Sequence, residues 1–544
     1  MTKRKKIAML ATCTALSASL LAGCGQADDK GSSSVSQTPA EAANAQENPF
    51  KEHMDISVAF WDIDNFAPKF ESDPIYQDLM KKFNITIKPI NITWDDYQQK
   101  LQTWAASGQL PDVFAVDAVG TQYQRSWIQQ GVVKALPALD QYPNLAKYFE
   151  APDMKALSLD GKYYNVPRKL YPSVDWSALD RVVVYRWDLA QKAGITKEPE
   201  TWDEFQAMLK AIVDKDPEGK HTTGLTASQT KLIGGLFWLY GNPAATSDGS
   251  GSDYKWIKEG NKFVPAVFSN KALPALTNMR NMYDNKLIDP DIAQTKPDLA
   301  YDKFMSGKSA ALLMAGGFVN IDGQLYNKRW KNTNPNDDIM KSIKVLKPLK
   351  GPDGQSYHSV FKTYWSESYF NAKIDDKKMD RIMRLYDYIL SPEGKDLMNF
   401  GVKDVDYKVE NGKKVMINPS ESLADKYPGT MQFLKTLVSY DNGDKYTMEN
   451  PTLGNIEVRK AAVDYIDWVI KNSKVPDYNI NLTYMSTPAK DKLTVFDHDD
   501  MLKVMLSRDP VDKVWGDIVA NYKAKGLDKA IEEVNTEAQK QGIK

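Results

Sequence analysis

Several aromatic and polar residues stand where predicted β-strands end in the first part of the sequence. They comprise one indole, three carboxylic acids and one amide: Trp61, Asp62, Asp64, Asn91 and Asp117. An indole face packs against the CH side of a pyranose ring, while carboxylate and amide groups exchange hydrogen bonds with hydroxyl groups. This set therefore predicts a binding site for a sugar. The alternative is that Trp61 fills a core or hinge position and that the acids are solvated loop caps.

The elements that would position these residues alternate between strand and helix. Residues 56–60 and 85–90 have strand character, and residues 110–117 form a short buried strand pattern. Helical spacing covers residues 76–83 and a segment that starts after Thr93 and ends before Gly108. This order is typical of a parallel sheet covered on both faces, which binds ligands outside the carboxyl ends of its strands. The predicted sugar-binding residues would then share one edge of the sheet.

The N-terminus predicts export and lipid attachment. Basic residues at positions 3–6 precede an uncharged stretch over residues 7–22 that is too short to span a bilayer comfortably, as in a secretory signal peptide. Leu21, Ala22, Gly23 and Cys24 resemble a bacterial lipobox, which implies removal of residues 1–23 and diacylation of Cys24. Two acyl chains hold a protein stably on a membrane surface. The alternatives are a transmembrane anchor or a chance cysteine in a signal peptide.

The residues after Cys24 predict a flexible tether. Residues 24–49 contain few apolar side chains and cannot bury enough surface to order themselves. Such a segment would let the folded body move away from the lipid headgroups and reach a partner in the membrane. No second apolar run of 18 or more residues follows, so no other part of the sequence is expected to span the bilayer.

Composition excludes several classes of function. Of the 2 cysteines, Cys13 lies in the predicted signal peptide and Cys24 would carry lipid, so the mature protein would have no free thiol. Cysteine-based zinc sites and cysteine nucleophiles are thereby excluded. The formal net charge is −1, and loss of the four basic residues of the signal peptide lowers it to −5. Nothing in this charge points to nucleic acid as a partner.

Four motifs resemble one known family. They are SGQLPDVF, DGKYYNVPR, VVVYRWDLAQKAGI and PETWDEFQAMLKAI, at residues 107–114, 160–168, 182–195 and 199–212. In this order they are similar to the extracellular solute-binding proteins of ABC importers, in the sugar-binding group. Within that group the chain resembles the long lipoprotein branch whose members take up alginate and other oligosaccharides. The resemblance implies an α/β, two-lobed, periplasmic-binding-protein-like fold of type II, with a hinge and an interlobe cleft.

The resemblance also implies partners, a location and a division into lobes. The ligand would be a carbohydrate, the membrane partner an ABC permease, and the location the outer face of the bacterial cytoplasmic membrane. The protein would bind without catalysis. One lobe would comprise residues 50–178 with about 366–435, and the other about 179–365 with 436–544.

The resemblance adds further candidates for ligand contact. Trp365 and Glu367 would lie at the hinge beside the cleft. Trp238 and Tyr240 could line the cleft or fill the core of the second lobe, and both alternatives stay open. Phe318 lies about one residue from the position of a sugar-stacking Trp in relatives.

Three cations bear on the charge of the sugar. They are Arg125, Arg168 and Lys169, of which we place Arg168 in the predicted ligand site. If they face the cleft, they could pair with uronate carboxylates and favour an acidic oligosaccharide.

The loop from Asp214 to Gly224 has some features of a calcium loop. Oxygen-bearing residues alternate around Gly219, and alginate-binding relatives carry a calcium site in the matching loop. Lys220 and His221, however, occupy positions where oxygen ligands are needed, and no acid closes the loop. We therefore expect no metal and no cofactor, with calcium in this loop as the alternative.

An enzyme would need groups that the sequence does not arrange in any known pattern. The histidines, His53, His221, His358 and His498, are scattered, and neither G-x-S-x-G nor HExxH spacing occurs. The acids at residues 497–500 are explained as caps at a helix N-terminus. A carboxylate pair for glycoside hydrolysis stays open because its separation is set in three dimensions. The alternatives are thus a secreted polysaccharide-degrading enzyme, or a receptor for a peptide or another solute.

Overall fold

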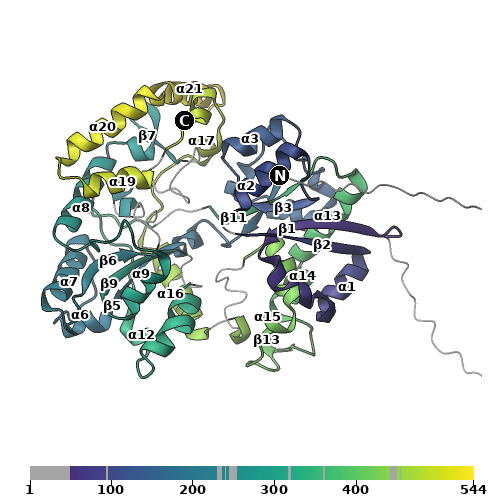
Figure 1. Ribbon diagram of the computed structural model, residues 1–544, viewed down its shortest axis with the longest axis horizontal. Coiled ribbons are helices and arrows are strands. Elements are labelled where there is room, and N and C mark those ends of the chain that lie inside the picture. Colours follow the sequence, from purple (N-terminus) through teal and green to yellow (C-terminus); the bar gives the residue numbers. More distant parts are fainter. Residues whose placement is uncertain are drawn as a thin grey trace, which may run out of the picture. The chain divides into compact units, whose positions relative to one another are not determined.

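Two separate β-sheets organise the chain in the computed structural model (Figure 1). The structure describes residues 50–93, 96–228, 236–238, 240–243, 254–315, 320–358, 362–440, 450–453, 455–495 and 497–544. Each sheet has its own hydrophobic core, and we call the two sheets with their helices the first and the second lobe.

Among the described residues, five strands form the sheet of the first lobe, in the order β2-β1-β3-β11-β4. Their bounds are β1 Met54–Trp61, β2 Ile85–Ile92, β3 Val113–Val116, β4 Asn165–Lys169 and β11 Tyr364–Phe370. Strands β2 and β3 run parallel to β1, which confirms the arrangement predicted for these three. Strand β11 runs antiparallel to β3 and β4, so the sheet as a whole is mixed rather than parallel. Local strand–helix alternation could not reveal this because β11 comes from a distant part of the chain.

Helices of the first lobe begin and end where local chemistry dictates. The side chain of Asp73 accepts a hydrogen bond from Tyr76 N and caps helix α1, and helix α2 ends at Gly108, whose φ is 67°. The end of α2 before Gly108 confirms the sequence prediction. The helices are α1 Pro74–Phe83, α2 Tyr97–Ser107, α3 Gln122–Gln129, α4 Pro143–Tyr148, α5 Pro152–Lys155, α13 Asp376–Leu390, α14 Pro392–Phe400 and α15 Leu423–Lys426.

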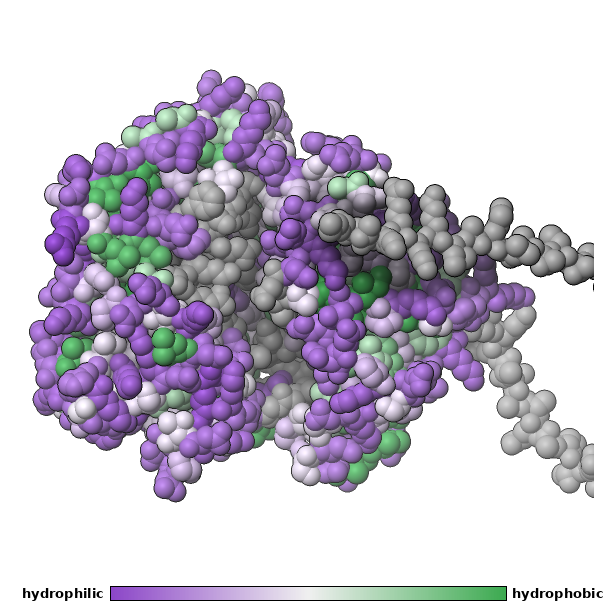
Figure 2. Space-filling view, in the orientation of Figure 1, coloured by the Kyte–Doolittle hydropathy of each residue, from purple (hydrophilic) through white to green (hydrophobic). Residues whose placement is uncertain are grey.

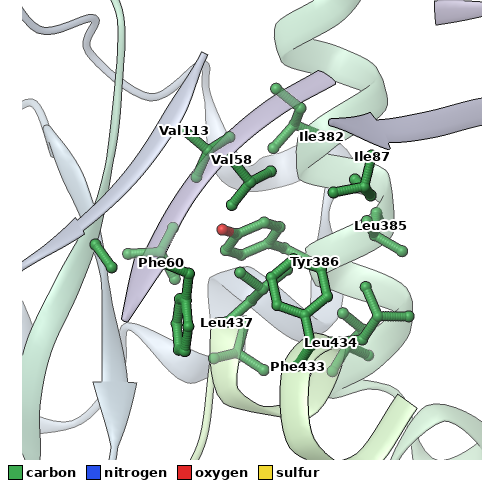
Figure 3. Close-up of a cluster of buried hydrophobic side chains, with 14 of the residues drawn as sticks. Val58, Phe60, Ile87, Val113, Ile382, Leu385, Tyr386, Phe433, Leu434 and Leu437 are labelled. Atoms are coloured by element: carbon green, nitrogen blue, oxygen red, sulfur yellow. The ribbon is translucent and has the colours of Figure 1, made fainter. Parts of the chain in front are cut away.

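The core of the first lobe joins segments that are far apart in the sequence. Figure 3 shows Val58 of β1 and Ile87 of β2 packed against Leu385 and Tyr386 of α13, with Leu437 alongside. The phenol of Tyr386 donates a hydrogen bond to Ser368 Oγ (3.0 Å), so this core contains a polar group that is satisfied internally. The first lobe is therefore built from an N-terminal segment and a returning segment that share one core.

The second lobe has a mixed sheet of four described strands, in the order β10-β5-β9-β6. Their bounds are β5 Arg181–Arg186, β6 Thr223–Ala227, β9 Ser309–Ala315 and β10 Ile343–Val345. Side chains alternate between the two faces: Val184 and Leu312 join one core, whereas Tyr185 and Leu313 join the other. Both faces of this sheet are thus covered.

Helices of the second lobe cover its sheet or pack on one another. They are α6 Trp187–Lys192, α7 Trp202–Lys215, α8 Ala272–Asp284, α9 Pro297–Met305, α11 Lys331–Thr333, α12 Ile339–Ser342, α16 Ile456–Asn472, α17 Ile480–Tyr484, α18 Pro488–Lys492, α19 Asp497–Leu506, α20 Val511–Ala524 and α21 Leu527–Lys540. Helix α7 begins with the predicted capping box, in which Thr201 and Glu204 each accept from the other's backbone N–H. Helix α19 begins at Asp497, where the acidic residues were predicted to start a helix.

Two small hairpins and the surface complete the fold. Strands β7 Trp256–Glu259 and β8 Lys262–Pro265 form one hairpin, and β12 Tyr407–Glu410 and β13 Lys413–Met416 form the other. Hydrophilic residues dominate the face of the molecule in Figure 2, with hydrophobic residues in small separate patches. No helix among the described residues is long and apolar enough to cross a membrane.

Three segments that link the lobes are hydrogen-bonded side by side. Leu170 N and Tyr171 N donate to Thr363 O (2.8 and 3.0 Å), just before β11. Lys169 N donates to Val438 O (2.9 Å), and Tyr440 N donates to Lys169 O (2.8 Å). Residues 169–171, 362–364 and 438–440 therefore run side by side between the two cores.

Candidate functional site

The carboxyl ends of the parallel strands of the first lobe place the predicted residues along one edge of its sheet. Strand β1 ends at Trp61, Asn91 is the penultimate residue of β2, and Asp117 follows β3 directly. Strand β11 starts at the same edge, since Tyr364 pairs with Lys169 at the end of β4. The tertiary structure thus adds Trp365 to the edge that the sequence predicted for the sugar-binding residues.

A bulge in β11 sets the position of Trp365. The strand register shifts between Tyr364 and Glu367, and Ser366 takes a left-handed conformation with φ 57°. A bulge re-aims the neighbouring side chain, and non-glycine residues with positive φ are costly enough to be maintained only where the surroundings impose them. Here the bulge directs the Trp365 ring onto Trp61, with centroids 5.4 Å apart and planes inclined by 24°.

Two tyrosines extend this stack into an aromatic platform, which we define as Trp61, Tyr97, Trp365 and Tyr440. Tyr97 meets Trp61 edge-on with centroids 5.2 Å apart, and Tyr440 lies 5.7 Å from Trp365. Trp61 is buried, whereas Tyr97, Trp365 and Tyr440 are half-buried. Half-buried aromatic rings are held rigidly by their neighbours and still expose part of an apolar face. The sequence patterns marked neither Tyr97 nor Tyr440 as a ligand contact, and the position of Tyr440 depends on the pairing of Lys169 with Ser439.

Acidic groups lie beside the platform in a largely enclosed setting. Asp117 Oδ1 accepts a hydrogen bond from Lys362 Nζ (3.3 Å), and both side chains are less than 10% exposed. Glu367 Oε2 accepts from the backbone N–H groups of Ala118 (2.9 Å) and Val119 (3.3 Å). Glu367 therefore fixes the turn that carries Asp117. Lys362 was not identified from the sequence because no motif marks it.

Burial changes the protonation of Glu367. Loss of hydration is the largest effect and raises the pKa of Glu367 to about 8, with the negative charge of Asp117 adding to it and Lys362 opposing it. A raised carboxyl pKa is also a feature of general acids in catalysis. Glu367 is 0% exposed, however, and one of its oxygens is bonded to two backbone N–H groups, so the described geometry suits a brace more than a group that meets a substrate.

Arg168 lies beneath the platform rather than at its surface. Its side chain is 0% exposed, and its Nη atoms donate to Ser366 Oγ (3.0 Å) and Ser368 Oγ (3.3 Å). The guanidinium carbon lies 5.4 Å from the ring centroid of Trp61, a cation–π contact. Arg168 thus ties β4 to β11 and supports the platform from below, while direct ligand contact by Arg168 stays a prediction.

Asp62, Asp64 and Asn91 form the polar margin of the platform. Asp62 has φ 51° and leads into a short 3-10 helix, which places Asp64 at the surface. Asp64 N donates to Asn91 Oδ1 (3.5 Å), so the loops after β1 and β2 are joined. These side chains are half-buried or exposed and stay candidates for hydroxyl contacts.

The candidates in the second lobe are more deeply packed or lie outside the described residues. Trp238 is 8% exposed and borders a small cavity of about 60 Å³ that is also lined by Trp202 and His358. Tyr240 is half-buried, and burial raises the pKa of Tyr240 to about 12. Phe318 falls outside the described residues. The structure therefore does not bring Trp238 or Tyr240 to the platform.

The other two predicted cations have protein partners. Arg125 Nε forms an ion pair with Asp491 Oδ2 of α18 (3.2 Å), and Arg125 Nη1 donates to Gly120 O (2.8 Å). Lys169 is half-buried, with its Nζ 5.9 Å from the ring centroid of Tyr148. Arg125 therefore links α3 to the C-terminal part of the chain. To bind a uronate carboxylate, Arg125 would have to break its ion pair with Asp491.

The loop from Asp214 to Gly224 does not suit a calcium ion. The carboxylate of Asp216 accepts hydrogen bonds from the N–H groups of Lys220 (3.0 Å), His221 (2.9 Å) and Thr222 (3.2 Å). Glu218 forms ion pairs with Lys192 and Lys220. Calcium takes six to eight oxygen ligands, and here Asp216 is bonded to N–H groups of the loop while Glu218 is paired with two lysines. Across the described part of the chain, no three acidic, histidine or cysteine side chains cluster as metal ligands.

Comparison with known sequences gives a consistent group of relatives. The profile of the family described as bacterial extracellular solute-binding protein matches residues 67–396. Lipoprotein LipO of Bacillus subtilis (strain 168) is 24% identical over 363 residues, which cover 64% of this chain and 67% of LipO. The diacetylchitobiose binding protein DasA of Streptomyces coelicolor is 24% identical over 260 residues, or 48% of this chain and 55% of DasA. The matches thus span about half to two thirds of these relatives.

Solved structures show the same fold. The S. pneumoniae ABC-transporter substrate binding protein FusA in complex with kestose matches with a TM-score of 0.65 at 16% identity, covering 91% of this chain and 100% of FusA. The alginate-binding protein AlgQ2 without calcium ion matches with a TM-score of 0.63 at 18% identity, covering 89% of this chain and 98% of AlgQ2. The predicted two-lobed α/β fold, with the type II arrangement of periplasmic binding proteins, is confirmed.

Proposed function

Because this chain belongs to the bacterial extracellular solute-binding protein family, we propose that it captures an oligosaccharide outside the cell and delivers it to an ABC permease. In this proposal a lipid on Cys24 holds the protein at the outer face of the cytoplasmic membrane, and residues 24–49 serve as the tether. The named ligands of relatives, diacetylchitobiose for DasA and kestose for FusA, support an oligosaccharide as the class of ligand.

The observation that carries the proposal is the aromatic platform at the carboxyl edge of the first sheet. The half-buried Trp365 is stacked on Trp61 and so provides a rigid apolar face. Because the ring is already fixed in the folded protein, ligand binding costs little further side-chain entropy. Asp62, Asp64 and Asn91 at its margin supply hydrogen-bond partners for hydroxyl groups. A carbohydrate needs this combination because each ring has an apolar face and a polar rim.

The three adjacent linking segments support a hinge in this proposal. Lys169, Thr363 and Val438 belong to segments that are bonded to one another, and the platform residues Trp365 and Tyr440 follow two of them directly. Rotation of a few backbone dihedrals there would bring the second lobe over a sugar on the platform. Ligand binding would then favour the closed form, which is the form we expect the permease to receive.

The charges around the platform favour a neutral sugar over a uronate. Arg168 is buried and bonded to two serines, and Arg125 is paired with Asp491. The margin of the platform, in contrast, carries carboxyl groups at Asp62 and Asp64. Like charges at short range repel, so a uronate at this edge would be disfavoured.

Ligand binding is tested on the chain from residue 25 onward, which retains the whole compact unit of residues 50–544. Thermal unfolding is followed with fructo-oligosaccharides, chito-oligosaccharides, malto-oligosaccharides and oligouronates, and the sugars are analysed afterwards for cleavage. A bound sugar at 100 times its Kd stabilises the protein by about 2.7 kcal/mol. Stabilisation by intact neutral oligosaccharides supports the proposal. Cleavage would indicate an enzyme instead, and stabilisation by oligouronates alone would reverse the assignment of charge.

The lipid anchor has its own test in cells. Cys24→Ser removes the thiol that would be acylated, and we expect the protein to leave the membrane fraction. Retention in the membrane at the unsubstituted level would show that Cys24 does not anchor the chain.

A further inference from the structure

A surface groove of about 440 Å³ lies between α2 and α3 of the first lobe. Its sides carry the exposed amides of Gln102, Gln122 and Gln130, and its lining includes the rings of Tyr123 and Trp127. This volume falls within the range of about 300–1,000 Å³ that is usual for small-molecule sites. The groove is therefore large enough to hold part of a ligand.

The lining of this groove is uncharged and combines amide and hydroxyl groups with apolar side chains. All nine of its lining residues lie in the described part of the chain, and their side chains carry no formal charge. Two cavities on the second lobe, one larger at about 580 Å³ and one smaller at about 320 Å³, have five and four charged residues in their linings. Since 26% of the whole chain is charged, the α2–α3 groove differs in character from other hollows of the surface.

The side chains of the groove match a polyhydroxylated ligand. An amide both donates and accepts hydrogen bonds, so one Gln can bond two neighbouring hydroxyl groups. Gln130 Nε2 donates to Ser126 Oγ (2.8 Å), which partly fixes one wall. Tyr123 meets Trp127 edge-on with centroids 5.0 Å apart, and the half-buried Tyr123 offers a ring surface to an apolar sugar face.

Helix α2 runs from the aromatic platform to the groove. Tyr97 at the start of α2 belongs to the platform, while Ala106 in the last turns of that helix lines the groove. Nine residues of helix separate these positions by about 14 Å. At the start of α3, the Tyr123 phenol donates to Asp117 O (2.6 Å), so this one side chain joins the groove to the residue that follows β3.

We propose that the α2–α3 groove is an outer carbohydrate subsite, which binds those units of a neutral oligosaccharide that extend beyond the aromatic platform. The inference rests on the proposed function and deepens it, because it assigns a structural basis for discrimination by chain length. Short sugars would be held by the platform alone. Longer neutral sugars would gain contacts with the amides of the groove.

The test fills the groove and measures affinity as a function of sugar length. Ala106 is exposed on the wall formed by α2, so Ala106→Tyr adds a ring to the groove without removing a packed side chain. The matched control is Gln129→Tyr, because Gln129 is exposed on α3 but lies outside the lining. Calorimetry uses neutral fructo-, chito- and malto-oligosaccharides of two to six units, with melting curves to verify folding of both variants.

The expected result is a loss that depends on length. Ala106→Tyr should weaken binding of the longest sugars about tenfold and leave the shortest bound sugar unchanged, since only the outer hydrogen bonds are removed. Gln129→Tyr should change the affinity for neither the longest nor the shortest sugar. Equal affinities of Ala106→Tyr and the unsubstituted chain at every length would overturn the subsite while leaving the proposed function intact. Absence of binding by every neutral sugar would overturn both.

A second readout separates the subsite from a protein-docking surface. If Ala106→Tyr reduces sugar uptake in cells while binding is unchanged at all lengths, the groove contacts a membrane partner and the subsite is refuted. If uptake falls only for long sugars, in parallel with their affinity, the subsite is supported.

Discussion

In the first lobe, Trp61 and Trp365 stack at the edge of a sheet with one of the two rings half-buried, whereas in the second lobe Trp238 is packed inward beside Trp202. The composition of the two sets is similar, but their surroundings differ. A bulge at Ser366 and a buried Arg168 hold the first set at the edge. Trp238 instead is 8% exposed and borders a small cavity of about 60 Å³. An aromatic residue becomes a binding surface when the backbone presents its face, and a core residue when packing covers it.

The largest effect is expected from removing the support of the platform. Arg168→Leu deletes a fully buried guanidinium and removes its hydrogen bonds to the hydroxyls of Ser366 and Ser368. We expect a loss of about 3 kcal/mol in the free energy of unfolding, measured by urea denaturation. The matched control, Arg384→Leu, removes an exposed ion pair with Asp380 and should cost less than about 1 kcal/mol. Unchanged stability of Arg168→Leu with lost sugar affinity would mean that Arg168 contacts the ligand.

The next effect concerns binding and contrasts the two lobes directly. Trp365→Ala removes the accessible face of the platform and should weaken sugar binding about 30-fold, a loss of about 2 kcal/mol, measured by calorimetry. Trp468→Ala, at a half-buried tryptophan on α16 of the second lobe, should leave the affinity unchanged. Equal losses of sugar affinity in the two variants would show that the tryptophan of the first lobe has no special role in binding.

A smaller effect is expected from the pH dependence of Glu367. The pKa of this carboxyl is raised to about 8 in the folded state, above its ordinary value of about 4.3 in the unfolded chain. The folded state thus binds more protons between these values, and the stability that Glu367 contributes falls as the pH rises from about 4 to about 8.

Glu367→Gln removes this titration while keeping an oxygen for Ala118 N and Val119 N. The Tm of this variant relative to the unsubstituted chain should therefore rise by a few degrees between pH 5 and pH 8.5. A constant difference across this range would show that Glu367 is ionised throughout.

The smallest effect tests a part of the second lobe that is remote from the platform. Thr201→Ala removes the side-chain half of the capping box of α7 and should lower the free energy of unfolding by about 1 kcal/mol. Sugar affinity should not change, as measured by calorimetry on the folded variant. A change in affinity would indicate that α7 is coupled to the site.

Local sequence patterns predicted the first strands and helices of the first lobe and which of their residues share one edge of its sheet. Apolar periodicity and Gly108 located the first strands and α2, and the strand order placed Trp61, Asn91 and Asp117 at one edge. Those predictions succeeded because they depend on contacts between residues that are near in sequence. The resemblance to solute-binding proteins contributed Trp365, and its bulge and stacking could be seen only once β11 was paired with β4.

By itself the sequence determined the first strands and helices and the start of the predicted sugar-binding edge, because periodicity and caps are encoded within short windows. The two-lobed fold and the family followed from the resemblance of four motifs to the solute-binding proteins. Tertiary structure alone decided that Arg168 lies beneath the platform and that Trp238 is packed inward. It also decided that Tyr440 joins the stack and that an uncharged groove lies between α2 and α3. The physical reason is that burial and stacking depend on which distant segments of the chain pack together. The same type of side chain can therefore form a binding surface in one place and fill a core in another.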